Sequence, residues 1–207
     1  DYGRHMLGQR GPGLSNYNRY DSGVADAACA WLRDRAQAPD ENPWTLFVGF
    51  VAPHFPLTVP AEFFELYPPQ AMPPPKLHPD DGHARHPWLQ TMAEYIKLDE
   101  YFDAADRRLN TALYFGLCSF LDHQVGRVLG ALEESGLGPE TRIVYTSDHG
   151  DNVGARGMWG KSTHYEESVG VPLIVAGPGV PEGRTSATTA SLVDAYQTVL
   201  DCSGLEV

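Results

Sequence analysis

The sequence is poor in cysteine, in basic residues and in long apolar runs. Its three cysteines, Cys29, Cys118 and Cys202, are odd in number and far apart. A disulfide framework or a zinc knuckle is therefore not expected, and a reducing, cytoplasmic compartment is the default prediction. No run of about 18 apolar residues is present to span a membrane. Fifteen lysines and arginines against 27 acidic residues give a net charge of −12, which argues against a nucleic-acid surface.

What is present is typical of a soluble globular protein. Hydrophobic residues make up 42% and charged residues 20% of the 207 positions, which suffices for one domain with a sizeable core. The first residues, Asp1-Tyr2-Gly3-Arg4-His5, lack the apolar stretch of a signal peptide. We expect residues 1–207 to belong to a single domain. A small anionic ligand remains compatible with the negative charge, because a pocket needs only a few local cations.

Apolar periodicity predicts an α/β fold. Three segments carry apolar residues at helical spacing and are expected to be helices: 21–36 (with Asp21 or Ser22 as cap), 111–134 and 191–201. Three shorter apolar runs are expected to be buried strands: 44–52, 142–146 and 171–176. Strands that alternate with helices indicate a largely parallel sheet.

Residues 68–91 are rich in proline and histidine and are expected to form a loop. His78, His83 and His86 lie within it, and their number raises the question of a second metal cluster. The proline-rich surroundings favour a solvated loop instead, one that could help to set substrate specificity.

Polar residues follow two of the predicted strands. Ala52-Pro53-His54 comes after the first, and Ser147-Asp148-His149-Gly150-Asp151 comes after the second. In open α/β sheets, ligands bind where strands end. An adjacent carboxylate and imidazole suit half of a metal site, although a strand-end turn with a helix cap explains the same residues. Further along, Lys161 follows a glycine and precedes two hydroxyl residues, where it could reach an anionic oxygen.

The order of these motifs resembles the sulfatase family of the alkaline-phosphatase superfamily, particularly its choline-sulfatase-like and phosphonate-monoester-hydrolase-like branch. The matching stretches are FVGFVAPHFPL at 47–57, SDHG at 147–150, WGKSTHYEE at 159–167 and VPLIVAGPG at 171–179. The resemblance extends over essentially the whole chain. It implies an alkaline-phosphatase-like α/β sandwich with a largely parallel central sheet flanked by helices, incomplete in this chain.

The resemblance also assigns roles to four residues. Asp148 and His149 match the family's downstream ligands to one divalent metal ion, Ca²⁺ or Mn²⁺. Lys161 matches the lysine that binds sulfate oxygens, and His54 matches the histidine that contacts the ester or its leaving group. The family's remaining metal ligands are acidic residues near its N-terminus, and no match to them is found here.

The family's nucleophile is a formylglycine made from cysteine or serine in the motif C/S-x-P/A-x-R. The nearest similar stretch is Cys29-Ala30-Trp31-Leu32-Arg33, in which tryptophan replaces the required proline or alanine within a predicted helix. Cys29 is therefore expected to be structural. We expect the chain to begin after the formylglycine segment, to stop before the family's C-terminal part, and to be inactive in isolation.

The expected function of the parent protein is metal-dependent hydrolysis of sulfate esters, with a small anionic ester as partner. A phosphonate monoester or phosphodiester hydrolase of the same superfamily is the alternative enzyme, and a catalytically inactive sulfatase-like fragment is the alternative from another class. Homo-oligomerisation stays open. Because parallel strands share one carboxyl edge, His54, Asp148, His149 and Lys161 are expected to line one cleft.

Overall fold

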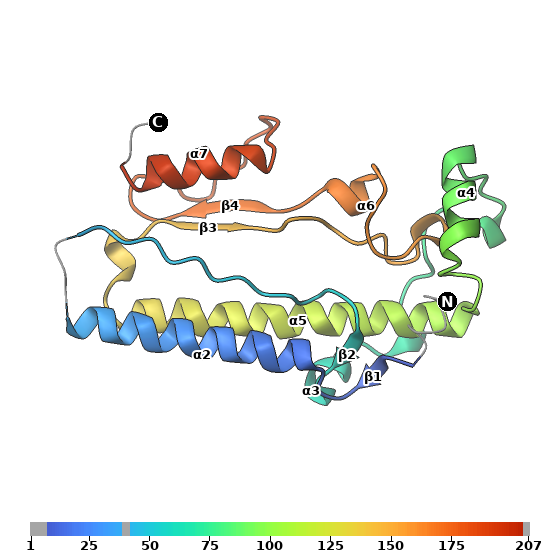
Figure 1. Cartoon of the computed structure of the whole chain (residues 1–207), viewed down its shortest axis with the longest axis horizontal. Helices are drawn as coiled ribbons and strands as arrows, with labels where there is room; N and C mark the ends of the chain where they lie inside the picture. Colours follow the sequence, from blue (N-terminus) through green and yellow to red (C-terminus); the bar gives the residue numbers. More distant parts are fainter. Residues whose placement is uncertain (1–7, 39–41, 205–207) are drawn as a thin grey trace. The chain divides into compact units, whose positions relative to one another are not determined.

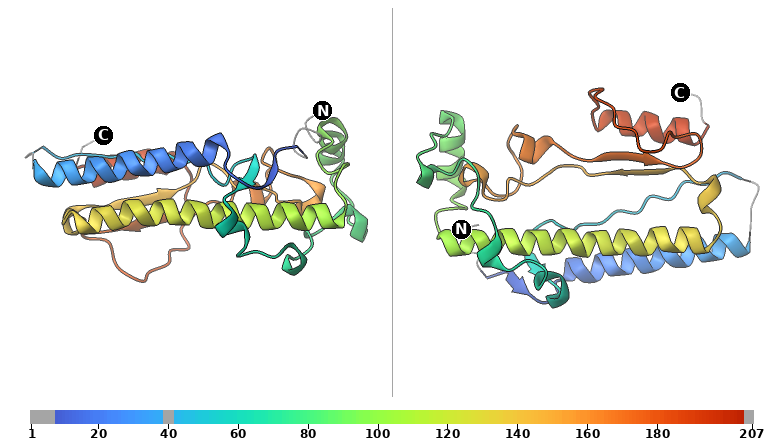
Figure 2. Two further views of the ribbon diagram at one scale, coloured as in Figure 1. Left: turned by 90° about the horizontal axis from the view of Figure 1, so that it is seen from below. Right: turned by 180° about the vertical axis from the view of Figure 1, so that it is seen from behind.

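The computed structural model describes residues 8–38 and 42–204. Their contacts gather in two compact units, and each is described by itself. The first contains residues 8–24, 49–125 and 149–170, and the second contains the remaining described residues. Figures 1 and 2 show the helices and strands of both. The expectation of a single catalytic domain over 1–207 stays a prediction.

Two long helices contribute residues to each unit. Helix α2 spans Asn16–Gln37 and helix α5 spans Ala104–Glu134, so both begin before their predicted starts at 21 and 111. The start of α2 follows from a reciprocal cap, since Asn18 N donates to Ser15 Oγ (3.1 Å) and Ser15 N donates to Asn18 Oδ1 (2.8 Å). Asp21 consequently lies inside the helix and does not cap it. Within the described ranges, no helix is both long and apolar enough to cross a membrane.

The first unit packs around the N-terminal half of α5. Strand β1 (Arg10–Pro12) pairs in parallel with β2 (Leu57–Val59), and the short helix α3 (Ala61–Phe64) follows directly. Helix α4 (Pro87–Ile96) and the single-turn helix α6 (Glu166–Val169) complete the unit. Its core consists of these buried residues: Leu57, Val59, Leu98, Phe102, Leu113, Leu117 and Trp159.

The second unit holds the other sheet. Strand β3 (Ile143–Thr146) pairs antiparallel with β4 (Leu173–Ala176), with Ile143 opposite Ala176. Between the two strands the chain passes through residues 149–170, which belong to the first unit. Helix α7 (Val193–Cys202) follows β4 (Figure 1). The unit's core combines the second half of α2 with the end of α5: Cys29, Leu32, Ala131 and Leu132.

The predicted strand at 44–52 is wrong in this structure. The segment is extended, but no described residue pairs with it in a sheet ladder. Strands β3 and β4 lie where the sequence predicts strands, yet they are not buried, and Ile174 remains 56% exposed. None of the apolar side chains of α7 is buried either, and Tyr196 is 65% exposed. The apolar pattern therefore predicted the positions of β3, β4 and α7 correctly, but it did not predict that they are not buried.

The core of the first unit yields a stability prediction. Leu113 lies fully buried on α5 (0% exposed), whereas Leu129 on the same helix is 41% exposed. Leu113→Ala leaves a cavity among packed side chains and is expected to lower the free energy of unfolding by about 2–5 kcal/mol. Leu129→Ala should change it by no more than about 0.5–1 kcal/mol. Urea unfolding of the two variants measures both values, and equal losses would contradict this placement of the core.

Candidate functional site

His54 lies on a turn that a buried carboxylate holds in place. Asp21 is completely buried, and its two oxygens accept hydrogen bonds from Val51 N and Ala52 N, each at 2.8 Å. The next turn is closed by a hydrogen bond from His54 N to Val51 O at 3.0 Å. Burial raises the pKa of Asp21, against the two backbone hydrogen bonds that lower it. Asp21 thus ties the first half of α2 to the segment that presents His54.

The imidazole of His54 contacts the side chain of Lys161. The ring's Nδ1 lies 2.7 Å from Phe55 O, and its Nε2 lies 2.9 Å from Lys161 Nζ. Because a carbonyl only accepts, Nδ1 carries the proton, and the lone pair on Nε2 accepts from the ammonium. His54 is therefore a neutral acceptor in this arrangement. One of the three N–H groups of Lys161 is directed at it.

His149 lies beside this pair. Its ring centroid is 6.1 Å from that of His54 in an edge arrangement, and its Nδ1 lies 2.8 Å from Gly150 O. A backbone carbonyl on one ring nitrogen is the usual partner of a histidine that binds a metal through the other, because it fixes tautomer and ring direction. Gly150 is needed here, since a Cβ would approach Glu167 O to 2.2 Å.

Asp151 holds the loop that leads to Lys161. Its Oδ1 accepts from Val153 N at 2.8 Å and from Gly160 N at 3.0 Å, so one carboxylate fixes both ends of the loop that precedes Lys161. Burial raises its pKa, and the two backbone hydrogen bonds and nearby His54 and His149 oppose that shift. These contacts make Asp151 a support of the loop that leads to Lys161.

Three of the four predicted site residues are brought together. His54, His149 and Lys161 meet within the first unit, whereas Asp148 is exposed and belongs to the second. The shared cleft of all four therefore stays a prediction. The reason given for that cleft, a shared edge of a parallel sheet, is wrong. His54 follows an extended segment that pairs with no strand among the described residues. Hydrogen-bonded turns, and not a sheet edge, place it beside Lys161. Within the described residues, no three His, Cys, Asp or Glu side chains are grouped to hold a metal ion.

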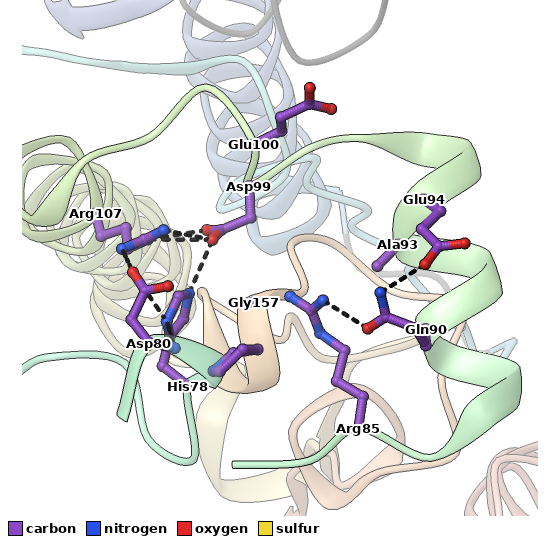
Figure 3. A pocket seen from close by; sticks show the side chains of 11 residues that line it. His78, Asp80, Arg85, Gln90, Ala93, Glu94, Asp99, Glu100, Arg107 and Gly157 are labelled. Carbon is purple, nitrogen blue, oxygen red and sulfur yellow. Dashed lines mark hydrogen bonds and ion pairs between the residues drawn. The ribbon is translucent and has the colours of Figure 1, made fainter. Parts of the chain in front are cut away.

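The expectation that His78 belongs to a solvated loop is wrong. His78 is only 4% exposed, and its Nε2 lies 2.8 Å from Asp99 Oδ2. The same carboxylate accepts from Arg107 and from the indole Nε1 of Trp159, the latter at 2.8 Å. His78, Asp99 and Arg107 line one wall of a pocket of about 370 Å³ (Figure 3). The partner of His78 is 21 residues away in sequence, and no local pattern announces it.

The other two histidines of the 68–91 segment behave differently. His83 is half-buried, and His86 is exposed and caps α4 by accepting from Trp88 N at 3.2 Å. The segment itself contains two short 3₁₀ turns, Pro69–Ala71 and Pro79–Asp81. The segment thus contains helical turns, and through His78 it contacts Asp99 of the same unit.

An ion-pair cluster fastens the far side of the Lys161 loop. Glu167 binds Lys76 Nζ at 2.7 Å and Arg156 at 2.9 Å, and the Arg156 guanidinium lies 3.8 Å from the Tyr165 ring centroid. Burial would raise the pKa of Glu167, but hydrogen bonds from Lys76 and Arg156 outweigh it and lower the pKa. Arg156 therefore has a structural role.

Sequence reasoning missed the supporting residues. Asp99, Arg107 and Trp159 carry the largest hydrogen-bonded network near the site, yet only Trp159 lies inside a recognisable motif. The one usable signal was the apolar Trp159 directly before Gly160-Lys161, because a buried indole N–H usually requires an acceptor.

Comparisons with known proteins agree with the order of motifs. The sulfatase family model matches residues 6–205. The chain is 32% identical over 221 aligned positions to a choline-sulfatase of Rhizobium meliloti, covering 100% of this chain and 42% of that protein. It is 31% identical to a sulfatase of Formosa agariphila, covering 86% of this chain and 36% of that protein.

Solved structures give the same result. The phosphonate monoester hydrolase of Agrobacterium radiobacter matches with a TM-score of 0.75 at 28% identity, over 88% of this chain and 39% of that one. The predicted α/β, alkaline-phosphatase-like fold class is confirmed by this likeness. The chain spans about two fifths of the length of the relatives it matches.

The Asp99 network predicts a pH dependence of stability. Burial would raise the pKa of Asp99, but hydrogen bonds from Arg107, Trp159 and His78 outweigh it, so the pKa lies below its ordinary 3.8. An acid with a lowered pKa stabilises the fold above its ordinary value and loses that contribution as the pH falls through the folded value. Asp99→Asn should lower the free energy of unfolding by about 3 kcal/mol at pH 7.

The difference in free energy of unfolding between Asp99→Asn and the unchanged protein should shrink below about pH 3.8, which is the ordinary pKa of an aspartate. Denaturant unfolding between pH 7 and pH 2.5 measures it. Asp122→Asn, a substitution at an exposed position of α5, serves as control and should stay within about 0.5 kcal/mol of the unchanged protein throughout. A deficit that keeps its full size at the acid end would show that the charge of Asp99 is not what stabilises the fold.

Proposed function

The chain belongs to the sulfatase family of the alkaline-phosphatase superfamily, and on that basis we propose that it forms part of a hydrolase of sulfate esters. The observation that carries the proposal is the contact between Lys161 Nζ and His54 Nε2 at 2.9 Å, with His149 beside it. A cation and a neutral imidazole are thereby brought to one place by separate segments of the chain. The whole protein's substrates are part of the same proposal.

Lys161 is suited to bind the anionic oxygens of the ester. It is exposed, and only one of its three N–H groups is directed at His54. The other two can donate to sulfate oxygens, where a positive charge stabilises the charge that develops during hydrolysis. Binding of the ester would draw the ammonium toward those oxygens.

His54 is suited to contact the leaving group. Its Nδ1 proton stays on Phe55 O, so its chemistry is confined to Nε2. A proton acquired at Nε2 could be given to the leaving oxygen, the role of a general acid.

Asp148 and His149 are proposed as ligands of one divalent cation, Ca²⁺ or Mn²⁺. The hydrogen bond from His149 Nδ1 to Gly150 O suits metal binding through Nε2. Two side chains are nevertheless too few for Ca²⁺, which takes about 6–8 oxygen ligands, and the described residues assemble no larger group. The remaining ligands would have to come from outside the described residues. A bound cation would supply positive charge beside the ester oxygens.

The formylglycine nucleophile would also have to lie outside the printed sequence. Cys29, the first residue of the most similar stretch, is 5% exposed inside α2 and packs in the core of the second unit. Its Sγ donates to Arg127 O at 3.5 Å. These contacts suit a structural cysteine and leave no room for an attacking group.

Hydrolysis of phosphonate monoesters is the second candidate. It is favoured by the likeness to the phosphonate monoester hydrolase of Agrobacterium radiobacter. Both esters present a tetrahedral anionic centre, which Lys161 and His54 would meet with the same groups. Parallel assays with an aryl sulfate and an aryl phosphonate monoester distinguish the two by their kcat/KM.

The first functional prediction concerns the 207-residue polypeptide by itself. With an aryl sulfate or an aryl phosphonate and added Ca²⁺ or Mn²⁺, we expect no turnover above background, because no nucleophile of the required type is present. The assay should include Cys29→Ala. Turnover that this variant retains would refute the need for a further segment, and turnover that it abolishes would make Cys29 the nucleophile.

The second prediction concerns Lys161 in the natural-length enzyme. Lys161→Ala should lower kcat/KM for the preferred ester by about 10² or more, since a charge-assisted contact to the reacting group is lost. Arg108→Ala, which removes the same charge from an exposed position of α5, should change it by less than about threefold. Steady-state kinetics of both variants decides the matter. Equal losses would mean that overall charge, and not this lysine, sets the rate.

A further inference from the structure

The loop that carries Lys161 is anchored to a buried carboxylate at Trp159. Asp99 is 9% exposed and receives hydrogen bonds from three side chains. Trp159 Nε1 donates to its Oδ1 at 2.8 Å, while His78 Nε2 and Arg107 meet its Oδ2 at 2.8 and 2.7 Å. Figure 3 shows His78 and Arg107 converging on Asp99. The three donors come from three separate segments of the chain.

Trp159 transmits this anchor to Lys161 over two residues. Its indole is 4% exposed and lies edge-on to Phe102, with ring centroids 5.4 Å apart. The next residue, Gly160, is held through both backbone groups, because its N–H donates to Asp151 and its carbonyl accepts from Asn152 N at 2.8 Å. Lys161 follows directly, so its backbone has little freedom to shift.

The backbone of this loop needs such anchors. Val153, Arg156 and Ser162 have positive φ values of 44°, 56° and 79°, a region that residues with side chains avoid. Such conformations persist only where the surroundings over-determine them. Here Arg85 Nε donates to Arg156 O at 2.6 Å and Arg156 N donates to Lys76 O at 3.1 Å. Two hydrogen bonds, one to the carbonyl and one from the N–H of Arg156, thus hold the loop in this unfavourable backbone conformation.

We propose that Asp99 is a positioning residue for Lys161. Its carboxylate fixes the indole of Trp159, and through it the loop that keeps the Lys161 ammonium beside His54. His78 and Arg107 act one step further away, by holding the carboxylate itself in place. The proposal rests on the proposed function for the role of Lys161. It adds that the 76–86 segment and the start of α5 are part of the machinery that orients the charge.

Trp159→Phe tests the proposal with the smallest change. It removes the N–H that Asp99 accepts but retains a ring to pack on Phe102, and Asp99 keeps its contacts with His78 and Arg107. In the natural-length enzyme kcat should fall by about tenfold while KM changes by less than about threefold, because misplacement of a charged group by a fraction of an ångström weakens the transition state most. Trp88→Phe, at a 57% exposed position of α4, should change neither.

The double variant separates positioning from general damage. If Trp159 acts through Lys161, Trp159→Phe should lower kcat/KM by less than about twofold in a Lys161→Ala background. A full tenfold loss in that background would overturn the proposal. If far-UV circular dichroism shows that Trp159→Phe does not fold, Asp99→Asn is measured in its place, because it removes the charge that Arg107 and Trp159 surround. Its kcat should then fall with KM little changed, and an unchanged kcat would overturn the proposal.

Amide hydrogen exchange of residues 152–162 gives a readout that needs no activity. Trp159→Phe should raise their exchange by about tenfold over the unchanged protein, because loss of an anchor raises the population of opened loop states, whereas Trp88→Phe should leave it the same. Unchanged exchange in Trp159→Phe would refute the anchor. Faster exchange together with full activity in Lys161→Ala would instead refute the proposed function while the anchor stands.

Discussion

A buried charge with several donors organises the part of the molecule that matters for function. Isolated ions are too unfavourable to bury, so Asp99 can stay inside only while enough donors surround it. Arg107, His78 and Trp159 meet that requirement. Because these donors come from the start of α5, from the proline-rich segment and from the Lys161 loop, satisfying one carboxylate fixes three segments against each other. The same constraint explains why a segment as rich in proline as 68–91 is ordered.

The second buried carboxylate applies the same principle to His54. Asp21 is fully buried and is satisfied by two backbone N–H groups, those of Val51 and Ala52. Those two N–H groups have no partner in a sheet ladder of the described residues. The carboxylate of Asp21 accepts the hydrogen bonds that a neighbouring strand would otherwise accept. Lys161 and His54 are therefore each presented by a backbone that a buried aspartate holds. Their contact at 2.9 Å is the meeting point of two independently anchored segments.

Local patterns in the sequence predicted what depends on local physics. The helical spacing of Leu113 and Leu117 identified α5 and its buried face, and the motif around Lys161 indicated a cation near His54. The order of motifs also gave the family. Burial could not be predicted in the same way, because an apolar run such as 44–52 reads as a buried strand whether or not the described chain supplies a partner for its backbone. The apolar pattern likewise does not say whether another segment covers Tyr196 and Ile174, and both are exposed.

The candidate site was harder to predict where its parts depend on distant partners. His78 and Asp99 are 21 residues apart and Asp99 and Trp159 are 60 apart, so neither pairing has a periodic signature. A histidine among prolines reads as solvated until its acceptor is known. Asp151 shows the opposite case, since its partners Val153 and Gly160 are near in sequence. The types of residue and the order of the motifs thus predict which residues act on the ester. The residues that orient them can be identified only in the structure, from the hydrogen-bond donors of the buried carboxylates.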